Sequence, residues 1–263
     1  MDDDKVAKAA ALLAEARRTG VRLRGLPDDC RPANAADANA IGDETARQLG
    51  EAIGGYKISF LFKPREAPFI SPLFDSRIFA APAEIPASLT PSLFIEPEIT
   101  FRLQHDLPPR DARYRTDEVA AAVIACPSFE IVDTRLDTDY RGIRDRMNER
   151  ATLLEIYADH QTSGAFIAGE GRADWADFDF ARTRVTMRAD GDTIVESIGG
   201  HAFTDPFLPL VVLANQMCSR DGLRAGQLLA TGSFTGFFPV RIGQKINAEF
   251  DGFGSVEAMF VDR

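Results

Sequence analysis

The stretch Leu93–Phe101 limits the fold most strongly, because its residues alternate as they do in a strand with two unlike faces. Alternate residues of a strand point the same way, so its odd-numbered, apolar positions share one face and Glu96 and Glu98 share the other. Two ionised carboxylates this close repel each other unless solvent or a cation compensates, and divalent ions such as Mg²⁺ prefer oxygen ligands. The stretch alone leaves two interpretations open, a metal site or an ordinary strand with two solvated glutamates.

A third acid lies in a second apolar stretch, the strand predicted over Ser128–Arg135, where Glu130 has apolar neighbours on both sides. The sequence before it predicts a helix over Thr116–Ala125, with Thr116 as the N-cap and Pro127 barring continuation. Three acids on two strands are enough to bind a divalent metal that keeps positions for water or substrate.

Two single residues are further candidates. Gly54 and Gly55 permit a tight backbone path, and the short strand after them presents Lys57, which is otherwise an ordinary surface charge. Asp75 lies between apolar residues, where a carboxylate needs a partner unless it caps a turn.

Two polar segments have the composition of site-lining loops. Tyr157–Gly164 is polar between apolar patches, and Thr231-Gly232-Ser233 offers hydroxyls and backbone N–H groups that could bind a carboxylate. The sequence has no dinucleotide fingerprint, no P-loop, no Gly-x-Ser-x-Gly elbow and no His-x-x-x-His pair.

The composition narrows the class of protein. A net charge of −10 over 263 residues disfavours nucleic-acid binding. The apolar runs are too short for a membrane span, and three scattered cysteines form no disulfide framework. The acidic start, Met1–Lys5, is unlike a signal peptide, so we expect a cytoplasmic protein.

The expected architecture is α+β. Helices are predicted over 5–19, 37–49 and 207–219, and a hairpin over 184–196 turns at Asp190-Gly191. Strands outnumber helices after residue 57, which favours a mixed or antiparallel β core. We expect residues 1–56 to form a helical cap or oligomer segment and residues 57–263 a metal-binding catalytic domain.

Five segments resemble, in order and spacing, the 2-keto-4-pentenoate hydratase and 2-oxo-3-hexenedioate decarboxylase family of the fumarylacetoacetate hydrolase superfamily. These segments are Gly54–Ile58, Ile95–Phe101, Glu130–Arg135, Leu213–Asn215 and Ala225–Ser233. The resemblance implies a mixed β-roll of the fumarylacetoacetase C-terminal type behind N-terminal helices, assembled into homo-oligomers.

The resemblance also implies residue roles. It implies that Glu96, Glu98 and Glu130 hold Mg²⁺ or Mn²⁺. It implies that Lys57 and Asp75 take part in substrate binding and proton transfer. The residues implied to orient the substrate are Thr162, Ser163, Thr231, Gly232 and Ser233.

The leading hypothesis is a hydratase that adds water to a 2-hydroxy-2,4-dienoate, giving a 4-hydroxy-2-oxo acid in aromatic catabolism. The alternatives are a 2-oxo-3-enedioate decarboxylase, an acylpyruvate hydrolase whose base is His160 or His201, and a non-catalytic subunit associated with a pathway enzyme.

The chain departs from the family pattern in four places, two of which are Ile242-Gly243-Gln244, where the family has Pro-Gly-Asp, and the region Phe60–Ser71. The family loop Ala-Asp-Asn-Ala-Ser-Ser-Gly is Ala158–Gly164 here, with His160 in place of asparagine, which predicts a titratable ring beside the site. The acid pair expected at 75–76 is Asp75-Ser76. Candidates for binding a second substrate carboxylate are Arg65, Arg77 and Arg144.

Overall fold

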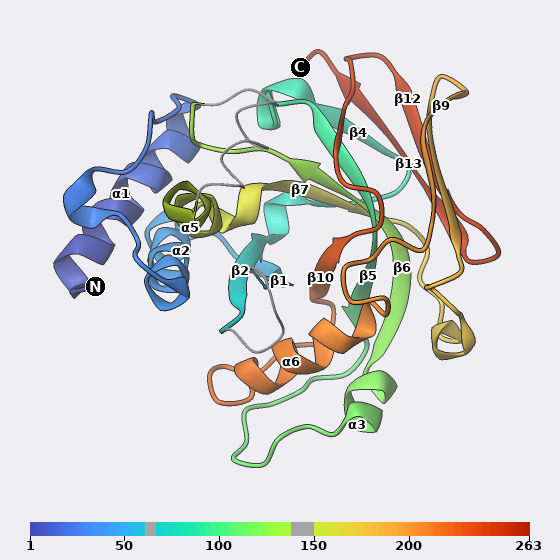
Figure 1. Cartoon of the computed structure of the whole chain (residues 1–263), viewed down its shortest axis with the longest axis horizontal. Helices are drawn as coiled ribbons and strands as arrows, with labels where there is room; N and C mark the ends of the chain where they lie inside the picture. The colour runs from blue at the N-terminus through green and yellow to red at the C-terminus, as the bar shows by residue number, and fades with distance from the viewer. Residues whose placement is uncertain (61–66, 138–149) are drawn as a thin grey trace.

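The computed structural model describes residues 1–60, 67–137 and 150–263 and shows a mixed α/β fold with curled sheets and few helices (Figure 1). The larger sheet has eight strands, in the order β2-β1-β10-β5-β6-β7-β3, with β11 paired to β5. Its strands are β1 Ile53–Ser59, β2 Phe69–Phe74, β3 Ile78–Ala80, β5 Phe94–Leu103, β6 Val123–Val132, β7 Ser163–Ala168, β10 Leu228–Ser233 and β11 Phe238–Pro239.

The smaller sheet has five strands, in the order β4-β13-β12-β8-β9. Its strands are β4 Ala83–Pro86, β8 Arg184–Ala189, β9 Asp192–Ile198, β12 Lys245–Phe250 and β13 Gly254–Val261. The predicted hairpin is confirmed as β8 and β9, which pair antiparallel around Asp190-Gly191.

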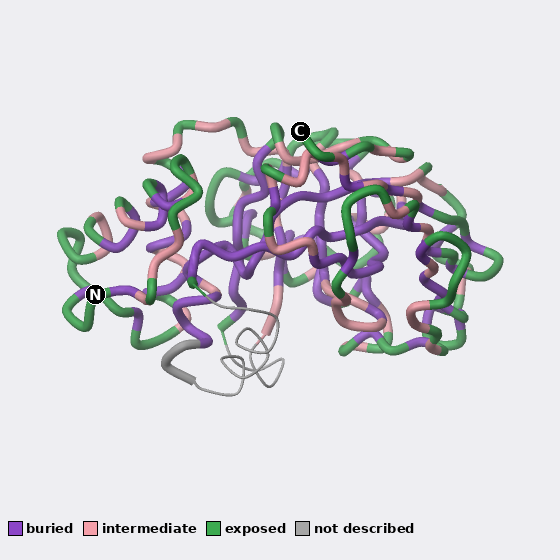
Figure 2. Tube along the Cα trace, turned by 90° about the horizontal axis from the view of Figure 1, so that it is seen from above, coloured by how far each residue is buried: buried purple, intermediate pink, exposed green. Residues whose placement is uncertain are grey.

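Strand β5 is covered on both faces. Ile95 belongs to an apolar cluster with Phe129 of β6 and Phe260 of β13, so its odd-numbered side faces the smaller sheet. Glu98 on the opposite side is wholly buried, and Glu96 is 8% exposed. The interpretation of an ordinary strand with solvated glutamates is therefore wrong, and Figure 2 shows that burial extends along the central strands.

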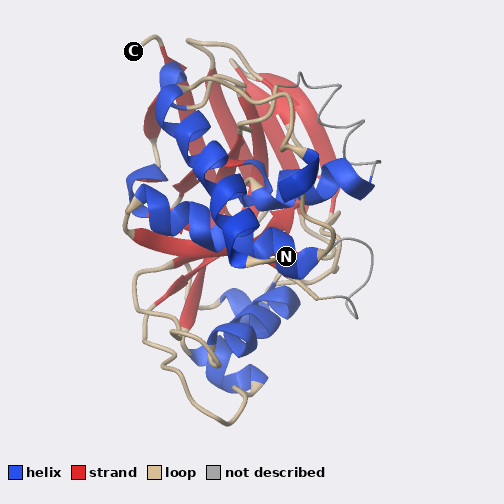
Figure 3. Cartoon of the chain, turned by 90° about the vertical axis from the view of Figure 1, so that its left-hand side faces the viewer, coloured by secondary structure: helices blue, strands red, loops and turns tan. Residues whose placement is uncertain are grey.

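Three helices pack at one end of the larger sheet (Figure 3): α1 Asp3–Thr19, α2 Ala35–Leu49 and α5 Arg150–Ala158. The first two confirm the predicted N-terminal helices, and each ends at a glycine in the left-handed conformation. Strand β1 begins just before the predicted boundary at residue 56, and the division into a cap and a catalytic domain remains a prediction.

The helix predicted over Thr116–Ala125 is too long. It ends at Ala121 as α3, and β6 starts at Val123 and runs through Pro127, which faces Ile99 of β5. Pairing with β5 over ten residues outweighs the local helical preference, because tertiary hydrogen bonding and burial override propensity.

Helix α6, Phe207–Met217, confirms the helix predicted there. Among the described residues, no helix is long and apolar enough to cross a membrane.

Candidate metal centre and active site

The pairing of β5 with β6 brings three glutamates together. Glu96 lies directly opposite Glu130, and Glu98 follows two residues along the same face. One carboxylate oxygen from each residue lies within 4.8 Å of the others, and Glu98 and Glu130 are fully buried. The three acids named from the sequence therefore form one cluster.

Three oxygens of the carboxylate cluster lack a hydrogen-bond partner among the described residues. Both Oε atoms of Glu98 and Oε1 of Glu130 are buried without a hydrogen-bond partner in the part of the chain that the structure describes. Burial raises the pKa of Glu96 and of Glu98 to about 8, and that of Glu130 to about 7. Orphaned buried oxygens are costly, and a divalent cation would satisfy them, so this donor set fits a metal ion with oxygen ligands.

Lys57 supplies one positive charge to this cluster. It lies on β1 and is 8% exposed, and its Nζ donates to Glu130 Oε2 at 2.5 Å. Burial alone would lower the pKa of Lys57, but the nearby glutamates, chiefly Glu130, raise it above its ordinary value. The lysine therefore stays charged, and its single charge does not balance three carboxylates.

The loop that follows α5 fixes Lys57 from the other side. His160, Gln161 and Thr162 all have positive φ, between 50° and 59°, which is rare for residues other than glycine. The Gln161 amide holds this turn by donating to Ser71 Oγ at 2.9 Å and accepting from Ser59 Oγ at 2.6 Å.

The main-chain oxygen of Gln161 accepts from Lys57 Nζ at 3.4 Å. Gln161 was not among the predicted site residues, although the departure of this loop from the family pattern pointed to the segment. Such strained turns persist where the surrounding structure holds them, and they cluster at functional sites.

Neither candidate histidine has a free ring nitrogen. His160 Nε2 lies 2.9 Å from the Gly42 oxygen and Nδ1 lies 3.5 Å from Arg17 Nη2. Burial lowers the pKa of His160 to about 3, so the ring stays neutral near pH 7 and links the loop to α2. His201 is held between the Thr231 oxygen, 3.1 Å from Nε2, and the backbone N–H of Phe203, 3.3 Å from Nδ1.

The two predicted orienting segments lie on strands flanking the glutamates. Ser233 of β10 is the register partner of Glu98, and Thr231 Oγ1 is a buried hydroxyl with no partner among the described residues. Gly232 between them has φ +120°, which few other residues adopt. Ser163 begins β7, and Thr162 Oγ1 donates to the main-chain oxygen of Gln161 in the loop just before it, at 2.6 Å.

Asp75 is not brought to the cluster. It is exposed in a short 3₁₀ turn, Asp75–Arg77, beyond β2, whereas the residue paired with Lys57 is Ser71. Four residues of extended chain separate Asp75 from Ser71, which is roughly 13 Å.

One of the three arginines proposed for a second substrate carboxylate, Arg77, does not contact the cluster either. Arg77 Nη1 donates to the Leu89 oxygen at 2.8 Å. Arg65 and Arg144 lie outside the described residues.

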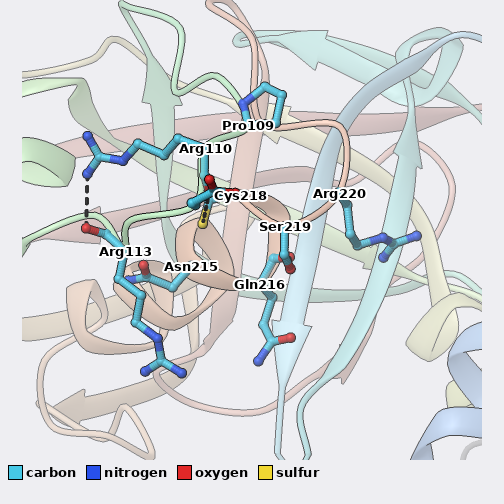
Figure 4. Close-up of a pocket in the computed structure, with 9 residues that line it drawn as sticks. Pro109, Arg110, Arg113, Asn215, Gln216, Cys218, Ser219 and Arg220 are labelled. Atoms are coloured by element: carbon cyan, nitrogen blue, oxygen red, sulfur yellow. Dashed lines mark hydrogen bonds between the residues drawn. The ribbon is translucent and has the colours of Figure 1, made fainter.

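A hollow of about 650 Å³ lies away from the glutamates, between the loop after β5 and the end of α6 (Figure 4). Arg110, Asn215 and Arg220 line it, and Arg110 and Arg220 are paired with acids outside it, namely Glu118 and Asp43. Asn215 belongs to one of the five segments that carry the family resemblance, but none of the predicted site residues lines this hollow.

Buried, convergent carboxylates beside a charged lysine, inside a curled sheet, form a donor set that could hold a divalent metal in an enzyme. No protein-family model matches the chain. It is 27% identical to the 2-keto-4-pentenoate hydratase of Burkholderia vietnamiensis, over 99% of both chains. It is 28% identical to the 4-oxalocrotonate decarboxylase of Pseudomonas putida, over 55% of this chain and 52% of that one.

Solved structures agree in fold. The 4-oxalocrotonate decarboxylase from Pseudomonas putida G7, complexed with magnesium and adipate, has a TM-score of 0.79 at 24% identity, with 99% of both chains covered. The same enzyme complexed with calcium and acetate gives 0.78. The resemblance stated from the motifs is confirmed: curated homologues named 2-keto-4-pentenoate hydratase align with nearly the whole chain at 25% to 28% identity.

Proposed function

We propose that the protein is a divalent-metal-dependent hydratase that adds water to a 2-hydroxy-2,4-dienoate and yields a 4-hydroxy-2-oxo acid. The observation that carries this proposal is the convergence of three buried glutamates beside Lys57, in a chain homologous over its length to hydratases. The substrate class comes from those relatives and fits a cationic, carboxylate-binding lysine.

Glu96, Glu98 and Glu130 would hold Mg²⁺ or Mn²⁺, since their orphaned oxygens suit a hard cation. When bound, the ion would stabilise the negative charge that develops on the 2-oxygen of the substrate. We also propose that the curled sheets are the β-roll of the fumarylacetoacetase C-terminal type.

Lys57 would bind the substrate carboxylate, because its ammonium group stays charged in this buried site. The reaction then needs loss of the proton of the 2-hydroxyl with protonation of carbon 5, addition of the hydroxyl of water at carbon 4, and transfer of the remaining water proton to carbon 3. The loop at Thr162 and Ser163 and the turn at Thr231–Ser233 would orient the substrate, and the Thr231 hydroxyl is free to donate.

Asp75 keeps its proposed role as proton carrier on the motif resemblance alone. Asp75→Asn is expected to reduce kcat about hundredfold if Asp75 carries the proton. Unchanged kcat would remove Asp75 from the mechanism and assign the transfer to another group.

A second candidate is decarboxylation of a 2-oxo-3-enedioate, favoured by the full-length likeness in fold to 4-oxalocrotonate decarboxylase. Incubation with a dienoate and with an enedioate, each with Mg²⁺ and analysed by mass spectrometry, separates the two. Hydration adds the mass of one water, whereas decarboxylation removes the mass of CO₂.

The hydrolase alternative is not favoured, because both nitrogens of His160 and of His201 are occupied. Glu98→Gln is expected to abolish metal binding and turnover, and full activity in metal-free buffer would contradict the site. Neither product from either substrate, with no Mn²⁺ bound, would favour a non-catalytic subunit. We further propose a cytoplasmic homo-oligomer, able to associate with a pathway enzyme.

A further inference from the structure

A second polar cavity, of about 300 Å³, lies at the C-terminal end of α1 and shares no lining residue with the three-glutamate cluster. Arginines dominate its lining, and Asp133 is the one acid among the described residues that line it. The arginines are Arg17, Arg18, Arg22, Arg77 and Arg135.

Two of the five arginines are neutralised by neighbouring acids. Arg22 Nη2 lies 2.9 Å from Asp133 Oδ1, and Arg135 Nε lies 2.5 Å from Asp159 Oδ1. Both carboxylate oxygens of Asp159 have hydrogen-bond partners, because Oδ2 also accepts from the backbone N–H of Arg135 and from Thr134 Oγ1.

The other three arginines meet no carboxylate within 4.0 Å in the described part of the chain and donate to neutral oxygens. Arg17 Nη2 donates to the Ser163 oxygen at 3.2 Å and Arg77 Nη1 to the Leu89 oxygen at 2.8 Å. Arg18 Nη2 donates to the Gln48 oxygen at 2.6 Å. Each of these guanidinium groups has further N–H donors that make no hydrogen bond to the described residues.

The clustered cations disfavour one another. Burial, and then the charge of Arg135, lower the pKa of Arg17 to about 9. The carbonyl end of α1 offers only about half a negative charge in compensation. A multivalent anion would remove this repulsion, as a cation would at the glutamates.

We propose that this cavity binds a small multivalent oxyanion, a di- or tricarboxylate or inorganic phosphate, through Arg17 and Arg77. Guanidinium groups bind carboxylate and phosphate oxygens through paired N–H donors, and the volume is at the lower end of the range for small-molecule pockets. The inference does not rest on the proposed function: Arg77 was a sequence candidate for a second substrate carboxylate, but none of the residues given a role in the proposed reaction lines this cavity.

The test is calorimetric titration of metal-free protein in a chloride buffer, with citrate, succinate and inorganic phosphate as separate probes. Metal is removed beforehand and the chelator is dialysed away, because a chelator is itself a polycarboxylate. We expect saturable binding of at least one probe, and its identity distinguishes carboxylate from phosphate.

Arg17→Met and Arg77→Met are each expected to weaken binding at least tenfold. The matched control is Arg241→Met, an exposed arginine that does not line the cavity, and Glu98→Gln controls for the metal centre. Both controls are expected to bind as the wild type does. Circular dichroism verifies that each variant folds. If Arg17→Met misfolds, Arg77→Met still tests the proposal, because Arg77 is a half-buried turn residue.

Three results would overturn the proposal: no saturable binding of any probe, unchanged affinity in Arg77→Met, or loss of binding in Glu98→Gln. If an acidic side chain of a second copy fills the cavity instead, the probes do not bind. Arg77→Met then shifts the protein to a smaller oligomer in light scattering.

Discussion

Replacing Glu98 by glutamine tests both the electrostatic state of the carboxylate cluster and its capacity for metal. Glu98 is fully buried, neither of its oxygens has a hydrogen-bond partner among the described residues, and burial raises its pKa from 4.5 to about 8. Glutamine has nearly the same shape but cannot ionise. We expect the metal-free variant to be more stable than the wild type in alkaline solution and to gain nothing from metal.

The direction follows from proton linkage. A raised pKa in the folded state gives stability that is present below pH 4.5 and is lost as pH rises towards 8, because the unfolded chain releases its proton first. Between pH 5.5 and 7.5, Glu98 alone accounts for a loss of roughly 2.5 kcal/mol in the free energy of unfolding. Glu98→Gln removes that part of the loss.

The assay is urea unfolding of metal-free protein at pH 5.5 and 7.5, at one protein concentration. Glu170→Gln, an exposed glutamate without an ion pair among the described residues, is the matched control and should behave as the wild type does. A metal at one hundred times its Kd should then stabilise the wild type and the control by about 2.7 kcal/mol and leave Glu98→Gln unchanged. Equal pH dependence in all three proteins would refute the buried, protonated carboxylate, and metal stabilisation of Glu98→Gln would refute the ligand assignment.

Three further changes test the surroundings of the cluster. Lys57→Met removes the positive charge beside the cluster and is expected to lower the free energy of unfolding of the metal-free protein, measured in urea at pH 8, by about 3 kcal/mol. It is also expected to lower turnover about hundredfold. Unchanged turnover would exclude Lys57 from catalysis. His160→Asn should leave the pH profile of turnover unchanged between pH 5.5 and 9, because the ring pKa is about 3, and should cost about 1 kcal/mol through the lost hydrogen bond to Gly42. A shifted profile would show that the ring titrates in the reaction. Gly55→Ala would place Cβ 1.9 Å from the Leu228 oxygen, so a loss of about 3 kcal/mol or more is expected in thermal unfolding, and a normal Tm would contradict the strand pairing.

Much of the fold was predictable where the signal is local. The N-terminal helices, the hairpin at Asp190-Gly191 and β5 follow from residue spacing, caps and turn chemistry, which act over a few residues. The helix over Thr116–Ala125 failed because β6 recruits its last residues to pair with β5, a contact that no short window contains.

The candidate site divides in the same way. Period-two alternation put Glu96 and Glu98 on one face, and the embedded acid Glu130 was visible as an anomaly in an apolar stretch. Alternation cannot tell a buried second face from a solvated one, because that depends on what packs against it.

Tertiary structure decided the rest. It placed Glu130 opposite Glu96 and Lys57 at 2.5 Å from Glu130, while leaving Asp75 exposed at the far end of β2. Register, burial and the strained turn at Gln161 arise from contacts between segments far apart in the chain. The sequence by itself therefore determined which side chains could carry the chemistry, and only the packed sheet determined which of them meet and in what charge state.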